Sequence, residues 1–272
     1  MDHADAQYLE AKRTVDDRAL DRRVRDRFVD ELPASPRIRE AAAGTGVTVP
    51  RLLDWGVTAG DYVGVDRGGD VIALARERRA GECGGAPTEA GFRVDDLTVR
   101  FEQGDALTAF AGDDADCVVA QAFLDVVPVG DALDAFADAL RPGGLVYAPI
   151  TFDGETTFQP DHPADDAVVA AYHDAIDAEP GRDSRAGRHL LDRCRAREGD
   201  LLAVGASDWV VYPPYPADER AFLATILEFV SDAVEGRVEG AVDWLRTRRR
   251  QLDAGELSYV AHGYDVLYRV PG

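Results

Sequence analysis

The stretch "REAAAGTGVTVPRLLDWG", residues 39–56, sets the interpretation of the whole chain. Small residues surround Gly44 and Gly46, and an apolar pattern at helical spacing comes directly after them. A glycine-rich turn between a strand and a helix lets the backbone approach a nucleotide-like ligand at the start of the helix. We therefore looked for strands and helices on both sides of this turn.

Strand-like and helix-like segments alternate along the first half of the chain. Strands are predicted at 37–43, 61–66, 97–105, 115–121 and 145–152, and helices at 6–32, 71–80 and 129–144. This alternation indicates a doubly wound α/β fold, in which helices cover both faces of a parallel sheet. We read residues 81–91 as a glycine-rich loop.

The pattern changes after residue 152. Helices are predicted at 164–181, 184–198 and, as a pair broken at Gly236, 218–255, with a sixth strand at 201–213 and a closing strand at 256–270. A final strand reached through a long helical segment is typical of an antiparallel strand added to a parallel sheet.

The charge balance of the 272 residues is strongly acidic. Fifty-one acidic residues against thirty basic ones give a formal charge of −21, and Lys12 is the only lysine. This composition resembles proteins of salt-loving microbes, because counterions screen such self-repulsion. It argues against a nucleic-acid partner, which requires a basic surface. The oligomeric state stays open.

Neither a membrane span nor a secretory signal is expected. No apolar run approaches eighteen residues, and the charged N-terminus lacks an apolar signal-peptide core. We expect a cytoplasmic protein without membrane partners. Three scattered cysteines (Cys83, Cys117 and Cys194) predict free thiols, with neither a disulfide framework nor a metal site.

Carboxylates follow the predicted strands in a fixed order. Glu40 lies just before the glycine turn, Asp66 ends the second strand, and Asp105 follows the third. The carboxyl ends of parallel strands meet at one edge of the sheet, where open α/β sheets bind ligands. There Asp66 could hold two ribose hydroxyls, and Asp105 an adenine amino group.

Three ligands compete for this arrangement: a nucleotide phosphate, a dinucleotide and S-adenosylmethionine. A dinucleotide enzyme favours a third glycine where this chain has Val49, and a phosphate-binding loop requires Lys-Ser/Thr where it has Val47-Thr48. S-adenosylmethionine fits best.

Four motifs in order resemble those of the class I S-adenosylmethionine-dependent methyltransferases that act on small molecules. They are "EAAAGTG" (40–46), "YVGVD" (62–66), "FEQGDAL" (101–107) and "ADCVVAQAFLDVV" (115–127). The resemblance implies a seven-stranded, mostly parallel, Rossmann-like sheet, S-adenosylmethionine as the cofactor, and a small-molecule methyl acceptor. It assigns to the cofactor Glu40, Ala42, Gly44, Gly46, Asp66, Arg67, Asp105, Ala106 and Gln121. Ala42 stands where the family usually has its first glycine, and an alanine can serve there if it keeps an ordinary strand conformation.

The acceptor side is less clearly marked. We expect residues 1–35 to form a lid helix, 36–152 the cofactor-binding core, and 153–272 the helical inserts and closing strand around the acceptor. Candidate substrate-binding residues are Tyr8, Arg13, Phe123, Phe152 and Tyr172, and candidate catalytic residues are His162, His173 and Asp125. Alternatively, the first helix simply covers the sheet, and the histidines are structural or exposed.

Two other functions compete with methyl transfer. One is an NAD(P)-dependent oxidoreductase on a Rossmann fold, and the other is a non-catalytic or regulatory protein that binds S-adenosylmethionine.

Overall fold

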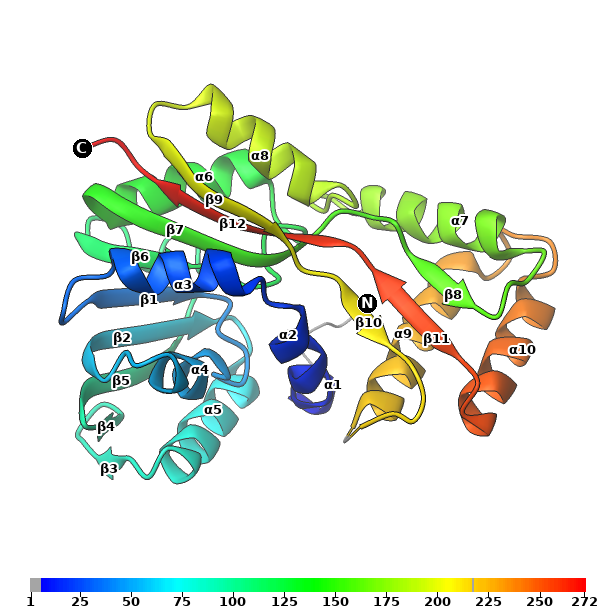
Figure 1. Cartoon of the computed structure of the whole chain (residues 1–272), viewed down its shortest axis with the longest axis horizontal. Coiled ribbons are helices and arrows are strands. Elements are labelled where there is room, and N and C mark those ends of the chain that lie inside the picture. Colours follow the sequence, from blue (N-terminus) through cyan, green and yellow to red (C-terminus); the bar gives the residue numbers. More distant parts are fainter. Residues whose placement is uncertain (1–5, 217) are drawn as a thin grey trace.

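The computed structural model describes residues 6–216 and 218–272 and is built on a nine-stranded sheet (Figure 1). In spatial order the strands are β3 (Ala86–Pro87), β4 (Phe92–Val94), β5 (Asp96–Gln103), β2 (Ala59–Asp66), β1 (Arg37–Ala41), β6 (Ala115–Val119), β7 (Leu140–Phe152), β12 (Gly263–Arg269) and β9 (Asp200–Ala206). Strands β5, β2, β1, β6 and β7 are parallel, and β12 runs antiparallel between β7 and β9. The doubly wound sheet and its antiparallel last strand are confirmed.

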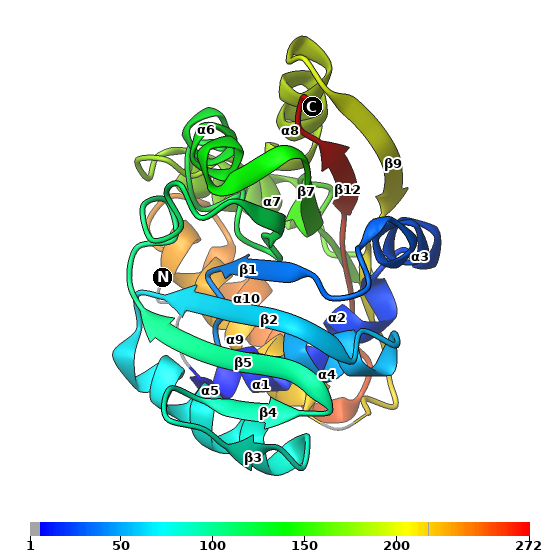
Figure 2. The same ribbon diagram turned by 90° about the vertical axis from the view of Figure 1, so that its left-hand side faces the viewer.

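The sheet has two strands more than predicted. Within the predicted glycine-rich loop, β3 pairs antiparallel with β4, and β4 pairs with β5. This hairpin extends the edge of the parallel sheet (Figure 2).

Helices pack on both faces of the sheet. One face carries α3 (Arg22–Glu31), α4 (Thr48–Asp54) and α5 (Gly69–Glu82), and the other carries α6 (Val129–Ala139) and α8 (Ala186–Ala196). Neighbouring residues of a strand pack into the hydrophobic cores on opposite faces of the sheet, because strand side chains alternate between the two faces. Thus Tyr62 packs with Phe28, whereas Val63 packs in the cluster that contains Phe136.

The single helix predicted over 6–32 is wrong, because this segment forms three helices. They are α1 (Ala6–Ala11), α2 (Arg13–Ala19) and α3. The backbone leaves the helical conformation at Leu20. The Asp21 side chain then accepts hydrogen bonds from the N–H groups of Arg23 and Val24 and so caps α3. The break lets α3 cover β9 and β12 while α1 packs on α9 (Glu219–Val234).

A second sheet continues three strands of the first. It has the order β10 (Trp209–Val211), β11 (Ser258–Ala261) and β8 (Thr157–Gln159), which extend β9, β12 and β7 beyond a bend (Figure 1). The predicted sixth and closing strands are therefore each divided in two. Around this small sheet, α1, α9, α7 (Asp165–Asp177) and α10 (Ala241–Ala254) enclose a separate core that contains Phe222, Trp244 and Tyr259.

A buried carboxylate holds the chain at the bend. Asp265 on β12 accepts hydrogen bonds from the backbone N–H groups of Ile150 and Asp21, each at 2.8 Å. Burial raises the pKa of Asp265 to about 6. The bend leaves Ile150 in a left-handed conformation, with φ of 56°.

Among residues 6–216 and 218–272, no helix combines the length and the apolar character needed to span a bilayer.

Candidate functional site

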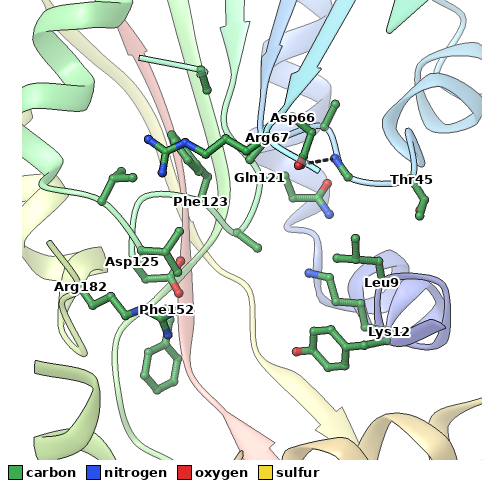
Figure 3. Close-up of a pocket in the computed structure, with 18 of the residues that line it drawn as sticks. Leu9, Lys12, Thr45, Asp66, Arg67, Gln121, Phe123, Asp125, Phe152 and Arg182 are labelled. Carbon is green, nitrogen blue, oxygen red and sulfur yellow. Dashed lines mark hydrogen bonds between the residues drawn. The ribbon is translucent and has the colours of Figure 1, made fainter. Parts of the chain in front are cut away.

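A cavity of about 340 Å³ opens at the carboxyl ends of β1, β2, β5 and β6 (Figure 3). The loops after these strands line one part of it, and Leu9 and Lys12 of the N-terminal helices lie across from Asp125, Phe152 and Arg182. The position matches the strand-end site predicted from the sequence.

Glu40 is the buried carboxylate of β1 at the floor of the cavity. The Thr48 hydroxyl donates to its Oε1 at 2.6 Å, and the Tyr62 hydroxyl donates to its Oε2. Burial raises the pKa of Glu40 to about 7, although both hydrogen bonds and nearby Arg51 act in the opposite direction. A cation bound in the cavity would favour its ionised form.

Asp66, at the end of β2, closes the glycine turn. Its Oδ2 accepts from the Gly44 N–H at 3.0 Å, and its Oδ1 accepts from the Gly68 N–H at 2.9 Å (Figure 3). Each oxygen keeps a second lone pair for a ligand hydroxyl. Gly44 lines the cavity with φ of 52°, so the turn needs a residue that tolerates the left-handed region.

Two expectations for the glycine turn are corrected. Ala42 does not keep a strand conformation, because its φ is 54°. Gly46 does not line the cavity: it points toward β5, where an added Cβ would lie 2.4 Å from Phe101. Close packing explains this glycine.

Asp105 and Ala106 line the cavity after β5. The N–H of Leu107 donates to Asp105 Oδ1 at 3.0 Å, and Arg67 contacts Oδ2 at 2.7 Å. These hydrogen bonds lower the pKa of Asp105 from its usual value. The Arg67–Asp105 pair thus joins the loops after neighbouring strands β2 and β5.

Gln121, after β6, joins the N-terminal helices to the sheet. Its Nε2 donates to Asp16 at 3.1 Å, and its Oε1 accepts from Arg51 at 2.7 Å. Asp16 is fully buried and also accepts from Trp209 and pairs with Lys12. This network fixes Lys12, which lines the cavity, and α2 against the sheet.

The other part of the cavity is an aromatic chamber, which we call the acceptor chamber. It is lined by Tyr8, Phe123, Phe152, Tyr172, Ile176, Ile226, Phe229 and Tyr259. Four of these are predicted substrate-binding residues, and Asp125 lies beside them.

Arg13, His162 and His173 lie outside the cavity lining. The helical repeat turns Arg13 away from the face of Tyr8 and Lys12, and it pairs with Glu82 on α5 at 2.6 Å. His173 follows cavity-lining Tyr172 on α7, so it points elsewhere, with its Nε2 3.0 Å from the Thr156 hydroxyl. His162 precedes α7, 3.8 Å from Asp243. This geometry gives none of the three direct access to a bound ligand.

Several lining residues escaped the sequence interpretation. Trp209, Phe229 and Tyr259 come from distant segments after residue 200, and no local motif marks them. Lys12, a candidate on the sequence together with Tyr8 and Arg13, does line the cavity, and it pairs there with Asp16 at i and i+4.

Comparisons with known proteins agree with this geometry. The family model described as "Methyltransferase domain" matches residues 40–148. No curated protein matches the chain. Among solved structures, a Bacillus halodurans protein assigned as a methyltransferase is 14% identical with a TM-score of 0.57, covering 92% of this chain and 99% of its own.

Two further structures resemble the chain to a similar degree. The YcgJ protein of Bacillus subtilis has 18% identity and a TM-score of 0.54, with coverage of 90% of this chain and 95% of its own. An S-adenosylmethionine-dependent methyltransferase of Methanosarcina mazei has 13% identity and a TM-score of 0.51, with coverage of 90% and 96%. At this identity the structures establish the fold, and the family model identifies the domain. Residues 40–148 therefore match a methyltransferase domain, and the chain has the fold of S-adenosylmethionine-dependent methyltransferases.

Proposed function

We propose that this enzyme methylates a small molecule held inside the cavity. The observation that carries the proposal is the continuity of one cavity from the strand ends at Asp66 and Asp105 to the acceptor chamber. A volume of about 340 Å³ lies in the range of small-molecule sites. The dinucleotide oxidoreductase is the weaker alternative, because the residues at the strand ends suit an adenosyl cofactor.

The residues at the strand ends fit the cofactor. We assign Asp66 to the ribose, Asp105, Ala106 and Arg67 to the adenine end, and Glu40, Ala42 and Gly44 to the methionine end. Gln121 lies between this part and the acceptor chamber. The bound cofactor supplies an electrophilic methyl group on a sulfonium sulfur. The carboxylates of Glu40 and Asp66 give its cationic groups and hydroxyls charged and hydrogen-bonding partners.

We assign the acceptor to the chamber residues Tyr8, Phe123, Phe152 and Tyr172. Helices α1 and α2 act as the lid in this proposal, and α3 is a structural helix of the sheet. The lid interpretation of the N-terminal segment thus applies to α1 and α2, and the alternative, a helix that covers the sheet, applies to α3. A closed lid excludes water and holds the acceptor in line with the methyl group.

Calorimetry tests the cofactor assignment. S-adenosylmethionine and S-adenosylhomocysteine should bind and NAD should not. Asp66→Ala should weaken binding by about 1–3 kcal/mol, because ribose hydroxyls lose their partner. Asp96→Ala is the control, since Asp96 is exposed at the opposite end of the neighbouring strand β5. Binding of NAD instead of S-adenosylmethionine would refute the assignment.

We also propose that the enzyme works in a salt-rich cytoplasm, where counterions screen its charge of −21. Its melting temperature should then be higher in molar KCl than in dilute buffer. An unchanged or lower melting temperature would refute this adaptation and leave the enzymatic proposal intact.

A further inference from the structure

The acceptor chamber is apolar on most of its surface, and its few polar groups define what it can hold. Tyr172 and Tyr259 are buried, and in the described part of the chain their hydroxyls make no hydrogen bond to protein. Asp125 is the carboxylate of the loop after β6 and lies beside Phe123 and Phe152 (Figure 3).

Asp125 has an unsatisfied oxygen. Its Oδ1 is inaccessible to solvent and has no hydrogen-bond partner in the described residues. Burial raises the pKa of this carboxyl, and burial together with the charge of Asp125 raises the pKa of Tyr172. An orphaned carboxylate oxygen in an enclosed site costs stability, so its presence there calls for a ligand that satisfies it.

The two cations nearest Asp125 are bound to other carboxylates. Lys12 pairs with Asp16 at 3.3 Å, and Arg182 pairs with Glu179 at 2.8 Å. Both cations lower the pKa of Asp125, yet neither bonds to Oδ1. Each of these cations therefore already has a carboxylate partner other than Asp125.

We propose that the methyl acceptor is a largely apolar molecule whose nucleophile is an amine nitrogen or a hydroxyl oxygen, and that its N–H or O–H donates to the carboxylate of Asp125, which borders the cavity. This inference rests on the proposed function, because it assigns the substrate class of the same cavity. The aromatic side chains bind the apolar body, and Tyr172 and Tyr259 offer hydroxyls to any further polar group.

The arrangement gives Asp125 a role in the reaction itself. The lone pair of the acceptor heteroatom forms a bond to the methyl carbon while the carbon–sulfur bond breaks, and its electron pair stays on sulfur as S-adenosylhomocysteine forms. Positive charge moves from the sulfonium to the acceptor heteroatom. The carboxylate of Asp125 stabilises this charge and receives the proton that the methylated heteroatom releases.

The same geometry disfavours anionic acceptors. A carboxylate head group placed at Oδ1 would bring two like charges together in an enclosed site and leave the orphaned oxygen without a donor. A purely hydrocarbon nucleophile would also leave it unsatisfied. The charge and hydrogen-bonding capacity of Asp125 therefore select the head group of the methyl acceptor, and the aromatic side chains of the chamber select its apolar body.

Three probes that share one apolar body separate the head groups: 2-phenylethylamine, 2-phenylethanol and phenylacetate, with the matching naphthyl series for a larger body. Calorimetry measures their binding to protein saturated with S-adenosylhomocysteine. We expect an amine or an alcohol to bind at least about tenfold more tightly than the carboxylate of the same body. The tighter of the two identifies the nitrogen or oxygen acceptor.

Asp125→Asn, nearly isosteric, should weaken that binding about tenfold and slow formation of S-adenosylhomocysteine with the same probe by a larger factor. Asp138→Asn, exposed on α6, is the control and should change neither. The melting temperature supplies a readout that needs no ligand: removing the orphaned charge should raise it, whereas a structural Asp125 would lower it. Asp125→Ser is the second variant if the amide fails to fold.

Three results would overturn the inference: the carboxylate probes bind as tightly as the others, no amine or alcohol of either series binds, or Asp125→Asn leaves the affinities unchanged. Binding of S-adenosylmethionine is measured first. Failure at that step refutes the proposed function, whereas success there followed by any of the three results refutes the substrate class alone.

Discussion

The two parts of the cavity are built in different ways. The cofactor part comes from consecutive strand ends of one parallel sheet, β1, β2, β5 and β6, within residues 37–127. The acceptor chamber combines α1, the loop after β6, the end of β7, α7, α9 and β11, and its residues Tyr8 and Tyr259 are 251 positions apart along the chain.

This difference matters because the two parts depend on different cores. Side chains of the large sheet pack on its helices in two clusters, and a third cluster joins α1, α7, α9, α10 and the small sheet. A cofactor site built on a regular sheet can stay fixed while the surroundings of the acceptor vary. Each prediction below tests that separation.

The largest effect is expected in the core of the small sheet. Trp244 on α10 is fully buried, packs edge-on against Phe158 with ring centroids 5.1 Å apart, and donates from Nε1 to Asp165 at 2.6 Å. Trp244→Ala should lower the free energy of unfolding by about 3–5 kcal/mol, because it leaves a cavity and removes one of the hydrogen bonds to Asp165, whose Oδ1 keeps Arg248 as a partner. Denaturant unfolding measures this change.

Hydrogen exchange then tests whether the two parts separate. Amides of α7 and α10 should lose more protection in Trp244→Ala than those of β1 and β2, and Trp244→Phe, which keeps a ring, should cost less. An equal loss of protection in both parts would show one cooperative unit and contradict the comparison.

The next effect concerns Glu40 in the cofactor part. Its pKa of about 7 lies above the usual 4.5, so the protonated form favours the folded protein without ligand. That stabilisation is complete below pH 4.5 and is lost as the pH rises through 7. A cationic cofactor prefers the ionised form, so its affinity should rise up to about tenfold per pH unit from pH 5.5 to 7.

As the pH rises from 5.5 to 7, the stability of the ligand-free protein should therefore fall while its affinity for the cofactor rises. Melting curves and calorimetry at each pH measure the two quantities. Glu40→Gln is the control, because it removes only the Glu40 carboxyl. It should abolish the pH dependence of the affinity and reduce that of the stability, to which Asp265 with its pKa of about 6 also contributes. If the affinity of the wild type were independent of pH, Glu40 would not face the cationic end of the cofactor.

The smallest effect is expected at Ala42. Its φ of 54° strains an alanine and suits a glycine, so Ala42→Gly should raise the free energy of unfolding by about 0.5–1 kcal/mol. Ala41→Gly, at the buried end of β1, should lower it. Thermal melts of the pair measure the difference. A loss of stability in Ala42→Gly would mean that the alanine methyl group makes contacts worth more than the strain.

The predicted site residues near strand ends mostly line the cavity, whereas those on helices do so only where the helical turn faces it, as at Tyr8 and Tyr172. Glu40, Asp66 and Asp105 line the cavity because a parallel sheet brings the ends of its strands to one edge. Arg13 and His173 fail because one residue along a helix is a rotation of about 100°, which turns each away from its cavity-lining neighbour. The kink at Leu20 was also missed, since its cause is the packing of α3 on β9 and β12.

The sequence by itself determined the doubly wound sheet, the order of its cofactor-side carboxylates and the match of residues 40–148 to a methyltransferase domain. Those properties follow from short-range periodicity and from strand ends that the alternating topology must bring together. Only the tertiary structure decided the left-handed Ala42, the fixed N-terminal helices and the acceptor chamber with its unpaired Asp125. Those depend on contacts between segments far apart in the chain, and no local pattern of residue types specifies which of them meet.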